Sequence, residues 1–398
     1  RLFRNPSLSW NDYNREIISK GGGVFARDAK SIRLSRQLRS LLGTDKAELS
    51  GQEIIRCILR MKADLLWNGG IGTYVKASSE HDSEVGDSAN NSVRINASEL
   101  GARVIGEGGN LGLTQRARIE YSLAGGRINT DALDNSSGVD MSDHEVNIKI
   151  LLQPMLQHGS LDFEERCRLL SSMTDSVSQL VLKNNYTQSM CLTLAERQGP
   201  SGLETLESLI RYLASEGDLN PKVEFLPTSK ELAGRKSSGL GMSRPELAVL
   251  LGYTKIGLKH SILHSDIPGS GIFRHYLYDY FPRELSKEYR QAFESHPLKN
   301  EIITTQLANL SVDCLGLSFF HRLINDTGAH PIEAIRVVLA LVEILDLHDL
   351  WSRVFALEGA AGIETQYRIM EDISESMRAV AHWVLLSGCD THSLDDFC

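Results

Sequence analysis

The chain has 398 residues, which is enough for two domains, and its composition of 41% hydrophobic and 23% charged residues is typical of a soluble globular protein. No apolar run approaches the roughly 20 residues that span a bilayer, so no membrane partner is expected. The net charge is −9, from 42 basic and 51 acidic residues, and no basic stripe is visible. This charge pattern argues against nucleic acid as a partner.

Six cysteines are scattered along the chain, and none forms a C-x-x-C pair. This usage predicts reduced thiols in a cytoplasmic protein. The twelve histidines are also scattered, and His144-Glu145 lacks the second histidine of an H-E-x-x-H helix. We therefore predict no metal site. Because the first residue is Arg1 and no leader pattern follows it, we expect the chain to begin inside a longer protein.

Residues 1–150 are rich in glycine and alternate between short apolar runs and helical patterns. Ser50 and Glu53 predict a capping box at the start of a helix, and Thr114 predicts the N-cap of another. A third helix is predicted from a second capping box, Ser142 with Glu145. Short apolar strands separated by helices are typical of a parallel sheet. The predicted helices are 50–62, 114–126 and 142–156, and the predicted strands are 63–70, 102–109 and 127–131.

The polar stretch 76–96 has little periodicity, and we expect a surface loop near a functional edge of the sheet. From about residue 151 the patterns are helical. The segment 218–239 reads as a turn-rich connector. Helices are predicted within 166–197, 243–263, 332–347 and 362–388.

The stretch VIGEGGNLGLTQRARIEY, residues 104–121, raises the question of a dinucleotide-binding turn. The fingerprint for a pyrophosphate is G-x-G-x-x-G after a strand. Gly106 and Gly108 supply the first two glycines, but Leu111 occupies the third position, and Gly109 and Gly112 are out of register. This junction is therefore predicted to serve another role than cradling the pyrophosphate.

Three segments carry a family resemblance: ADLLWNGGIGTYVKAS, the stretch from ARVIGEGGN through DNSSGVDMSDHEVNIKILL, and GMSRPELAVLLGYTKI. Together they resemble the large, NAD-specific class of glutamate dehydrogenase over nearly the whole chain. The resemblance implies an α/β fold: the C-terminal portion of a Rossmann-type NAD-binding domain with a parallel sheet over 1–150. A mainly α-helical C-terminal domain would follow over 151–398. The catalytic lysines and aspartate would lie upstream of Arg1, so we expect no catalytic residue in this chain.

The resemblance also implies cofactor-binding positions. Asn110 matches an asparagine that lies against the nicotinamide ribose, and an exposed amide offers sugar hydroxyls both a donor and an acceptor. Asn68, Gly69 and Gly70 match a turn where the backbone passes close to the cofactor. Asn135 matches an asparagine at the nicotinamide end. The alternative for these residues is that they form turns, because asparagine and glycine both tolerate turn conformations.

Val139 and Ser142 match positions that contact the amino-acid substrate. Ser142 would also serve as a helix N-cap, and the two roles are compatible because a helix N-terminus favours a carboxylate. Asp140 beside it would repel a dicarboxylate unless its side chain is turned away. In the helical region, five residues in shared motifs are interpreted as structural: Asn184, Asn185, Tyr186, Arg244 and His296.

The predicted function is part of an NAD-dependent glutamate dehydrogenase, which converts L-glutamate to 2-oxoglutarate and ammonia with hydride transfer to NAD. The chain is expected to be inactive alone and the enzyme to be a homo-oligomer. Two alternatives stay open. One is a related amino-acid dehydrogenase with another substrate, and the other is a non-catalytic helical module for assembly or regulation.

Overall fold

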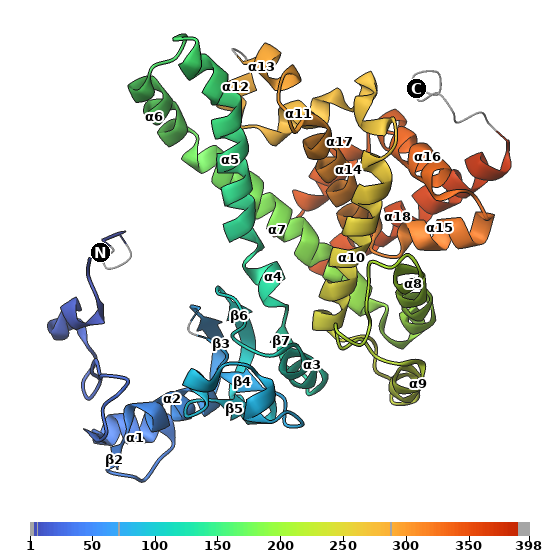
Figure 1. Ribbon diagram of the computed structural model, residues 1–398. Helices are drawn as coiled ribbons and strands as arrows, with labels where there is room; N and C mark the ends of the chain where they lie inside the picture. The colour runs from blue at the N-terminus through green and yellow to red at the C-terminus, as the bar shows by residue number, and fades with distance from the viewer. Residues whose placement is uncertain (1–3, 6, 71, 287–288, 389–398) are drawn as a thin grey trace. The chain divides into compact units, whose positions relative to one another are not determined.

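The computed structural model describes residues 4–5, 7–70, 72–286 and 289–388, and the chain forms two compact units, Arg1–Asp134 and Asn135–Cys398. The first is an α/β unit and the second is helical (Figure 1). The predicted fold class, a parallel sheet followed by a mainly helical region, is confirmed. The predicted domain boundary at residue 150 lies inside helix α5, and it stays a prediction.

Within the residues that the structure describes, the α/β unit is built from short strands and four α-helices, joined by 3-10 turns. Its centre is a three-stranded sheet in the order β3-β6-β7, with all strands parallel. Two small sheets accompany it, antiparallel β1-β2 and parallel β4-β5. The elements are β1 Ile32–Arg33, α1 Arg36–Leu42, β2 Glu48–Leu49, α2 Gly51–Arg60, β3 Ala63–Asn68, β4 Val75–Lys76, β5 Ile95–Asn96, β6 Ala102–Glu107, α3 Gln115–Leu123, β7 Arg127–Ile128 and α4 Asp131–Asp134.

The predicted helix starts at Ser50 and Thr114 are confirmed. Ser50 and Glu53 form the capping box of α2, and the Thr114 side chain accepts from the Ala117 N–H at the start of α3. The strands end two or three residues earlier than predicted, and glycines start the turns after β3 and β6. One face of the sheet packs on a core that includes Ile105, Leu113 and Tyr121.

The opposite face of the central sheet is open within the described residues. Leu65 of β3 pairs with Val104 of β6, and Trp67 pairs with Gly106, so these side chains share one face. Leu65, Trp67 and Val104 are 57%, 62% and 38% exposed. Parallel sheets are normally covered on both faces, so this apolar surface suits a further layer of protein.

Much of the segment 76–96 is exposed and irregular, as its polar composition predicted, but residues near its end are buried. Val93 and Ile95 are buried in the core, and β5 pairs in parallel with β4. The buried Arg94 guanidinium donates to the Thr73 carbonyl at 2.9 Å and to Asp82 at 2.9 Å. The buried arginine thus holds parts of this segment together through polar contacts. A pattern of apolar residues cannot predict such contacts.

The helical unit consists of fourteen α-helices within the described residues. Helix α14 lies at its centre and packs against α7, α10, α11 and α18 (Figure 1). The helices are α5 Ser136–Gln157, α6 Phe163–Ser172, α7 Thr174–Arg197, α8 Leu203–Ser215, α9 Ser229–Ser237, α10 Arg244–Leu263, α11 Arg274–Tyr280, α12 Arg283–Ser286, α13 Arg290–Glu294, α14 Lys299–Leu315, α15 Phe319–Thr327, α16 Pro331–Ile344, α17 Leu347–Phe355 and α18 Ile363–Leu386.

The predicted core helix within 332–347 is confirmed as α16, whose apolar side chains are buried. The predicted connector 218–239 contains the helix α9, which begins with a capping box of Thr228 and Glu231. No single helix of the described ranges is long and apolar enough to cross a membrane. Only α14 and α15 pass that test together, with an 83° bend between them.

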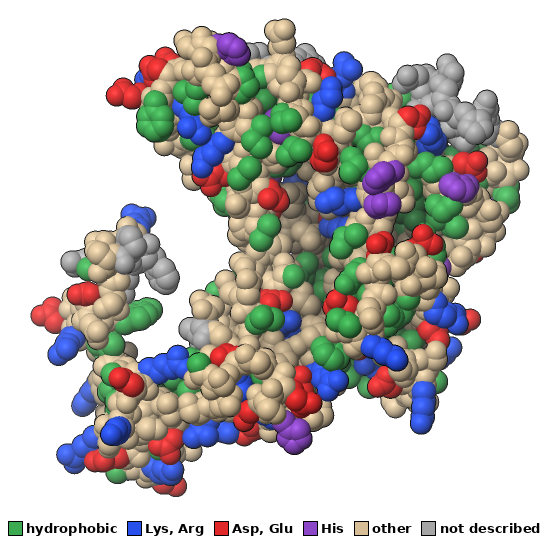
Figure 2. Space-filling model, viewed as in Figure 1, with side chains coloured by type: hydrophobic (Ala, Val, Ile, Leu, Met, Phe, Trp, Pro, Cys, Tyr) green, Lys and Arg blue, Asp and Glu red, His purple; other side chains and the backbone are tan. Residues whose placement is uncertain are grey.

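The four cysteines that fall within the described residues, Cys57, Cys167, Cys191 and Cys314, are free thiols. Cys389 and Cys398 lie outside the described residues. Acidic and basic side chains are interspersed on the face drawn in Figure 2.

Candidate functional site

Two glycine-containing turns lie next to each other at the carboxyl edge of the central sheet. Asn68 ends β3 and pairs with Glu107, which ends β6. The Gly108 N–H donates to the Asn68 carbonyl at 2.8 Å, and the Gly70 N–H donates to the Asn68 side-chain oxygen at 3.2 Å. The edge where parallel strands end is where open α/β sheets bind their ligands.

The two turns touch through their backbones. A Cβ on Gly109 would lie 2.2 Å from the Gly70 Cα, and Gly70 has a φ of +85°. A side chain at Gly109 would force the turns apart, and one at Gly70 would strain a backbone with positive φ. At Gly69, by contrast, a Cβ would meet no atom within 4 Å. Gly69 and Gly70 are exposed, so a ligand can approach this backbone directly.

Asn110 is exposed at the tip of the second turn, and Asn68 is buried with 9% exposure. The residue with a left-handed backbone is Leu111, at φ +56°, not Asn110. The Leu111 N–H donates to Asp131 at 2.8 Å, and the Leu111 carbonyl accepts from the Thr73 hydroxyl at 2.7 Å. The turn is therefore held from both sides, and Asn110 lies at an exposed position in it.

A buried charge network supports this turn, and the sequence analysis did not identify it. Arg118 of α3 donates to Glu107 through Nε at 2.6 Å and through Nη2 at 3.0 Å, and its Nη2 lies 3.2 Å from Asp131. Glu107 also accepts from the Leu113 N–H at 3.1 Å. Burial raises the pKa of Glu107, and the two hydrogen bonds from Arg118 oppose that effect.

A sequence signal for this network existed. Glu107 follows a buried strand directly, and Arg118 falls between Ala117 and Tyr121 on the buried side of α3. Charged residues at buried positions are rarely left without partners, so the two residues could have been paired.

In the helical unit, Asn135, Val139 and Ser142 lie at the start of α5. Asn135 is the N-cap residue, and the helix begins at Ser136. Val139 and Ser142 are three residues apart on an exposed helix surface, and Val139 is 62% exposed. The predicted helix start at Ser142 is wrong, because the helix extends about two turns further toward the N-terminus.

Polar contacts from α7 hold the first turns of α5. Asn184 donates to Asp140 at 2.8 Å, and Asn185 donates to Ser136 at 3.0 Å. Asp140 also lies 3.6 Å from His144, so its carboxylate is turned into the helical unit. The Asp140 side chain is thus turned away, which is the condition under which it would not repel a dicarboxylate bound beside it.

The other motif residues of the helical unit make structural contacts as well. Arg244 donates to the Ser189 carbonyl and the Thr193 hydroxyl, each at 3.0 Å. The His296 side chain contacts the Asn147 carbonyl at 3.2 Å. Tyr186 packs edge-on against Phe355 at 5.6 Å between ring centroids.

Comparison with known proteins decides the family. Residues 1–195 match the model of the bacterial NAD-glutamate dehydrogenase catalytic domain, and residues 239–396 match that of the glutamate dehydrogenase C-terminal region. An NAD-specific glutamate dehydrogenase of Mycobacterium tuberculosis is 44% identical over 97% of this chain and 24% of its own length. Those of Halomonas elongata and Pseudomonas aeruginosa are 43% and 41% identical, over 100% and 97% of this chain and 25% and 24% of their own lengths.

The chain belongs to the large NAD-specific class of glutamate dehydrogenases. It spans about a quarter of the length of the curated relatives it matches. The match to the catalytic-domain family covers the central sheet, all of α5 and most of α7.

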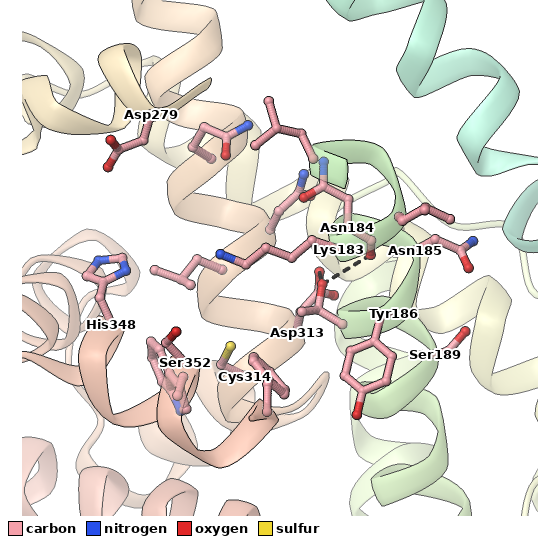
Figure 3. A pocket seen from close by; sticks show the side chains of 18 of the residues that line it. Lys183, Asn184, Asn185, Tyr186, Ser189, Asp279, Asp313, Cys314, His348 and Ser352 are labelled. Atoms are coloured by element: carbon pink, nitrogen blue, oxygen red, sulfur yellow. Dashed lines mark hydrogen bonds between the residues drawn. The ribbon is translucent and has the colours of Figure 1, made fainter. Parts of the chain in front are cut away.

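The chain also has a cavity of about 860 Å³ in its helical unit. The cavity lies among α7, α11, α14 and α17 (Figure 3). The Lys183 side chain extends into it from α7, and Asp313 lines it from α14. Asp313 pairs with Lys255 of α10 at 2.7 Å, and burial raises the pKa of Asp313. The sequence analysis predicted no site in this region.

Proposed function

We propose that this chain is part of an NAD-dependent glutamate dehydrogenase that oxidises L-glutamate to 2-oxoglutarate and ammonia. The observation that carries the proposal is the pair of contacting glycine turns after β3 and β6, with the exposed Asn110 at the tip of one of them. An open sheet edge of this kind, in a chain of this family, suits the nicotinamide end of NAD.

The residues present fit one part of NAD. Gly69 leaves open space where a Cβ would stand, so backbone can lie against a flat ring or a ribose. Asn110 offers a donor and an acceptor to ribose hydroxyls. The pyrophosphate turn is not among the sequence motifs of this chain, so the fit concerns the nicotinamide side only.

NAD, when bound, supplies the hydride acceptor of the reaction. The chain's own residues would bind and orient the cofactor and the substrate. Asn110 would fix the nicotinamide ribose, the backbone of Asn68, Gly69 and Gly70 would form a wall, and Asn135 would contact the nicotinamide end. Val139 and Ser142 would contact the amino-acid substrate from the exposed surface of α5.

We also propose that the working enzyme is longer than this chain, that this chain is inactive alone, and that the enzyme is a cytoplasmic homo-oligomer. The open apolar face of Leu65, Trp67 and Val104 supports the need for further protein against the sheet. The proposal predicts no reduction of NAD by glutamate with the 398-residue chain, measured by absorbance. If the isolated chain reduced NAD at a rate usual for enzymes, the proposal that it is inactive by itself would be refuted.

The proposed oligomeric state is tested by light scattering.

The experiment that tests the cofactor site is Asn110→Ala in the intact enzyme. Loss of a hydrogen bond to a ligand costs about 1–3 kcal/mol, so we expect NAD affinity to fall by roughly 5–150-fold. Asn11→Ala, also at an exposed asparagine of the α/β unit, is the matched control and should leave NAD binding unchanged. Equal NAD affinity in Asn110→Ala and the control would refute the ribose contact.

A substrate panel separates glutamate from other amino acids. The proposal expects a kcat/KM for L-glutamate at least about 100-fold above that for aliphatic amino acids, because a site built for a charged group rejects a substrate without it. Comparable values for an aliphatic amino acid would favour the related-dehydrogenase alternative.

A further inference from the structure

Two histidines and a glutamate from three helices converge in the helical unit. His275 lies on α11, Glu343 on α16 and His348 on α17, and one ligand atom of each lies within 4.8 Å of the others. Their side chains are partly buried, with exposed fractions of 40%, 18% and 34%. The His275 and His348 rings stand nearly perpendicular, at 86°, with centroids 5.8 Å apart.

The distances suit a shared metal ion. The His275 Nε2 lies 3.7 Å from Glu343 Oε2, and the His348 Nε2 lies 3.6 Å from Glu343 Oε1. Ligands at the zinc bond lengths of about 2.0–2.2 Å stand roughly 3.3–3.6 Å apart in a tetrahedron. The two distances end on different oxygens of Glu343, so to hold one ion the carboxylate would bind through both oxygens or rotate to present one, and the three side chains would move closer together.

His275 is already oriented as a metal ligand. Its Nδ1 lies 3.0 Å from the Ile272 carbonyl. A carbonyl accepts only, so Nδ1 carries a proton, and in the neutral imidazole the lone pair lies on Nε2, the nitrogen nearer Glu343. Metal-binding histidines usually have this second contact to a carbonyl or carboxylate.

We propose that His275, Glu343 and His348 form a binding site for a zinc-class divalent transition metal. Imidazole and carboxylate are zinc ligands, and two histidines with one glutamate leave a fourth position for water. Imidazole does not suit Mg²⁺ or Ca²⁺, which prefer oxygen ligands. The ion would tie α11, α16 and α17 together.

Tyr276 contacts two of the three proposed ligands. Its hydroxyl contacts the Glu343 Oε1 at 2.8 Å and the His348 Nε2 at 2.5 Å. Metal binding takes the Nε2 lone pair of His348, so it replaces the contact of that nitrogen with Tyr276 and leaves the proton on Nδ1. Tyr276 and His348 also line the cavity of Figure 3, which gives a water or a small ligand access to the fourth position.

The sequence offered no sign of this site. His275 and His348 are far apart in the chain, and Glu343 lies in the apolar segment that predicted a core helix. Only the packing of α11 against α16 and α17 brings them together.

The test uses the 398-residue chain, stripped of metal by chelation and dialysed against Zn²⁺. We expect one zinc per chain at the trio by elemental analysis and a higher thermal unfolding midpoint with zinc. Glu343→Gln and His348→Asn should each weaken zinc binding by more than about tenfold, since losing even an outer partner of a metal ligand costs about 10–100-fold. His275→Asn, at the most exposed ligand, serves if the other variants do not fold.

The matched control is His260→Asn with His264→Asn. These two histidines lie at the C-terminal end of α10, with ring centroids 4.3 Å apart and planes tilted by 40°, and form the kind of surface pair that binds zinc adventitiously. The double variant should keep the zinc stoichiometry and the thermal shift. Zinc binding lost in the control, or kept at full affinity in both Glu343→Gln and His275→Asn, would overturn the proposal.

Cobalt substitution gives a second readout, because four-coordinate cobalt absorbs strongly in the visible range. A six-coordinate spectrum unchanged in His275→Asn would also contradict the site.

Discussion

Both oxygens of the buried Glu107 carboxylate accept hydrogen bonds from the Arg118 guanidinium, at 2.6 Å from Nε and 3.0 Å from Nη2. This pair joins the last residue of β6 to α3, and the turn that carries Asn110 lies between them in sequence. Arg118 also reaches Asp131, which accepts from the Leu111 N–H. The position of the proposed ribose-binding amide thus depends on a buried ion pair.

Glu107→Gln should strongly destabilise the α/β unit. Breaking a buried ion pair by removing one charge costs about 3–5 kcal/mol, because the other charge stays buried. We expect a loss of that size in the free energy of unfolding, measured by urea denaturation. Arg103→Gln is the control, because its pair with Asp64 is 83% and 92% exposed and should contribute less than about 1 kcal/mol. Similar losses in both variants would contradict the role of the buried pair.

Gly109→Ala and Gly69→Ala should separate structure from cofactor binding. The Cβ of Gly109→Ala would meet the Gly70 backbone at 2.2 Å, so we expect a loss of about 1–3 kcal/mol in stability. Gly69→Ala meets open space and should fold normally, yet it should weaken NAD binding in the intact enzyme by on the order of tenfold, about 1.4 kcal/mol. Unchanged NAD affinity in Gly69→Ala would show that no cofactor lies against that backbone.

The sequence predicted those features that local patterns determine. The capping box at Ser50 and the cap at Thr114 satisfy their own helix ends, so three or four neighbouring residues are enough to identify them. The parallel sheet followed from apolar runs between helices. The family motifs then directed attention to Asn110, which the structure places at the surface.

What the sequence did not reveal depends on distant partners. Arg94 contacts Thr73 and Asp82, and Glu107 contacts Arg118 and Asp134, through hydrogen bonds that close only in the fold. The true start of α5 also depends on α7, through Asn184 and Asn185. Ser142 with Glu145 matches a capping box locally, but contacts between helices extend the helix past that point.

Ser142→Ala tests whether Ser142 lies inside α5, as in the structure, or caps its N-terminus, as the sequence predicted. An N-cap serine replaced by alanine costs about 1 kcal/mol, whereas an exposed mid-helix position should change stability by less than about 0.5 kcal/mol. We expect the second outcome in urea unfolding of the chain. A loss of about 1 kcal/mol would support the cap that the sequence predicted.

The same variant tests substrate contact in the intact enzyme. If the Ser142 hydroxyl binds glutamate, Ser142→Ala should raise KM for glutamate by roughly tenfold and leave KM for NAD unchanged. Ser160→Ala, at another exposed serine of the helical unit, should change neither value. An unchanged KM for glutamate in Ser142→Ala would remove this residue from the substrate site.

The capping box of α2 predicts a measurable pH dependence. The Ser50 N–H and hydroxyl lie 2.9 Å and 3.0 Å from the Glu53 carboxylate, and these bonds, with Lys46, lower the pKa of Glu53 from 4.5 to about 2. A carboxyl whose pKa is lower in the folded state stabilises the fold fully above its unfolded pKa. That contribution is lost as the pH falls from about 4.5 to about 2.

Ser50→Ala should therefore raise the pKa of Glu53 toward its ordinary value, because it removes the hydroxyl and loosens the first turn of α2. The carboxyl carbon of Glu53, followed by NMR between pH 2 and pH 6, gives the pKa directly. Lys46→Gln should raise the pKa less, since the hydrogen bonds from Ser50 are the larger causes of the shift and Lys46 is 66% exposed. A larger shift in Lys46→Gln than in Ser50→Ala would mean that the ammonium, and not the cap, holds the carboxylate in its charged form.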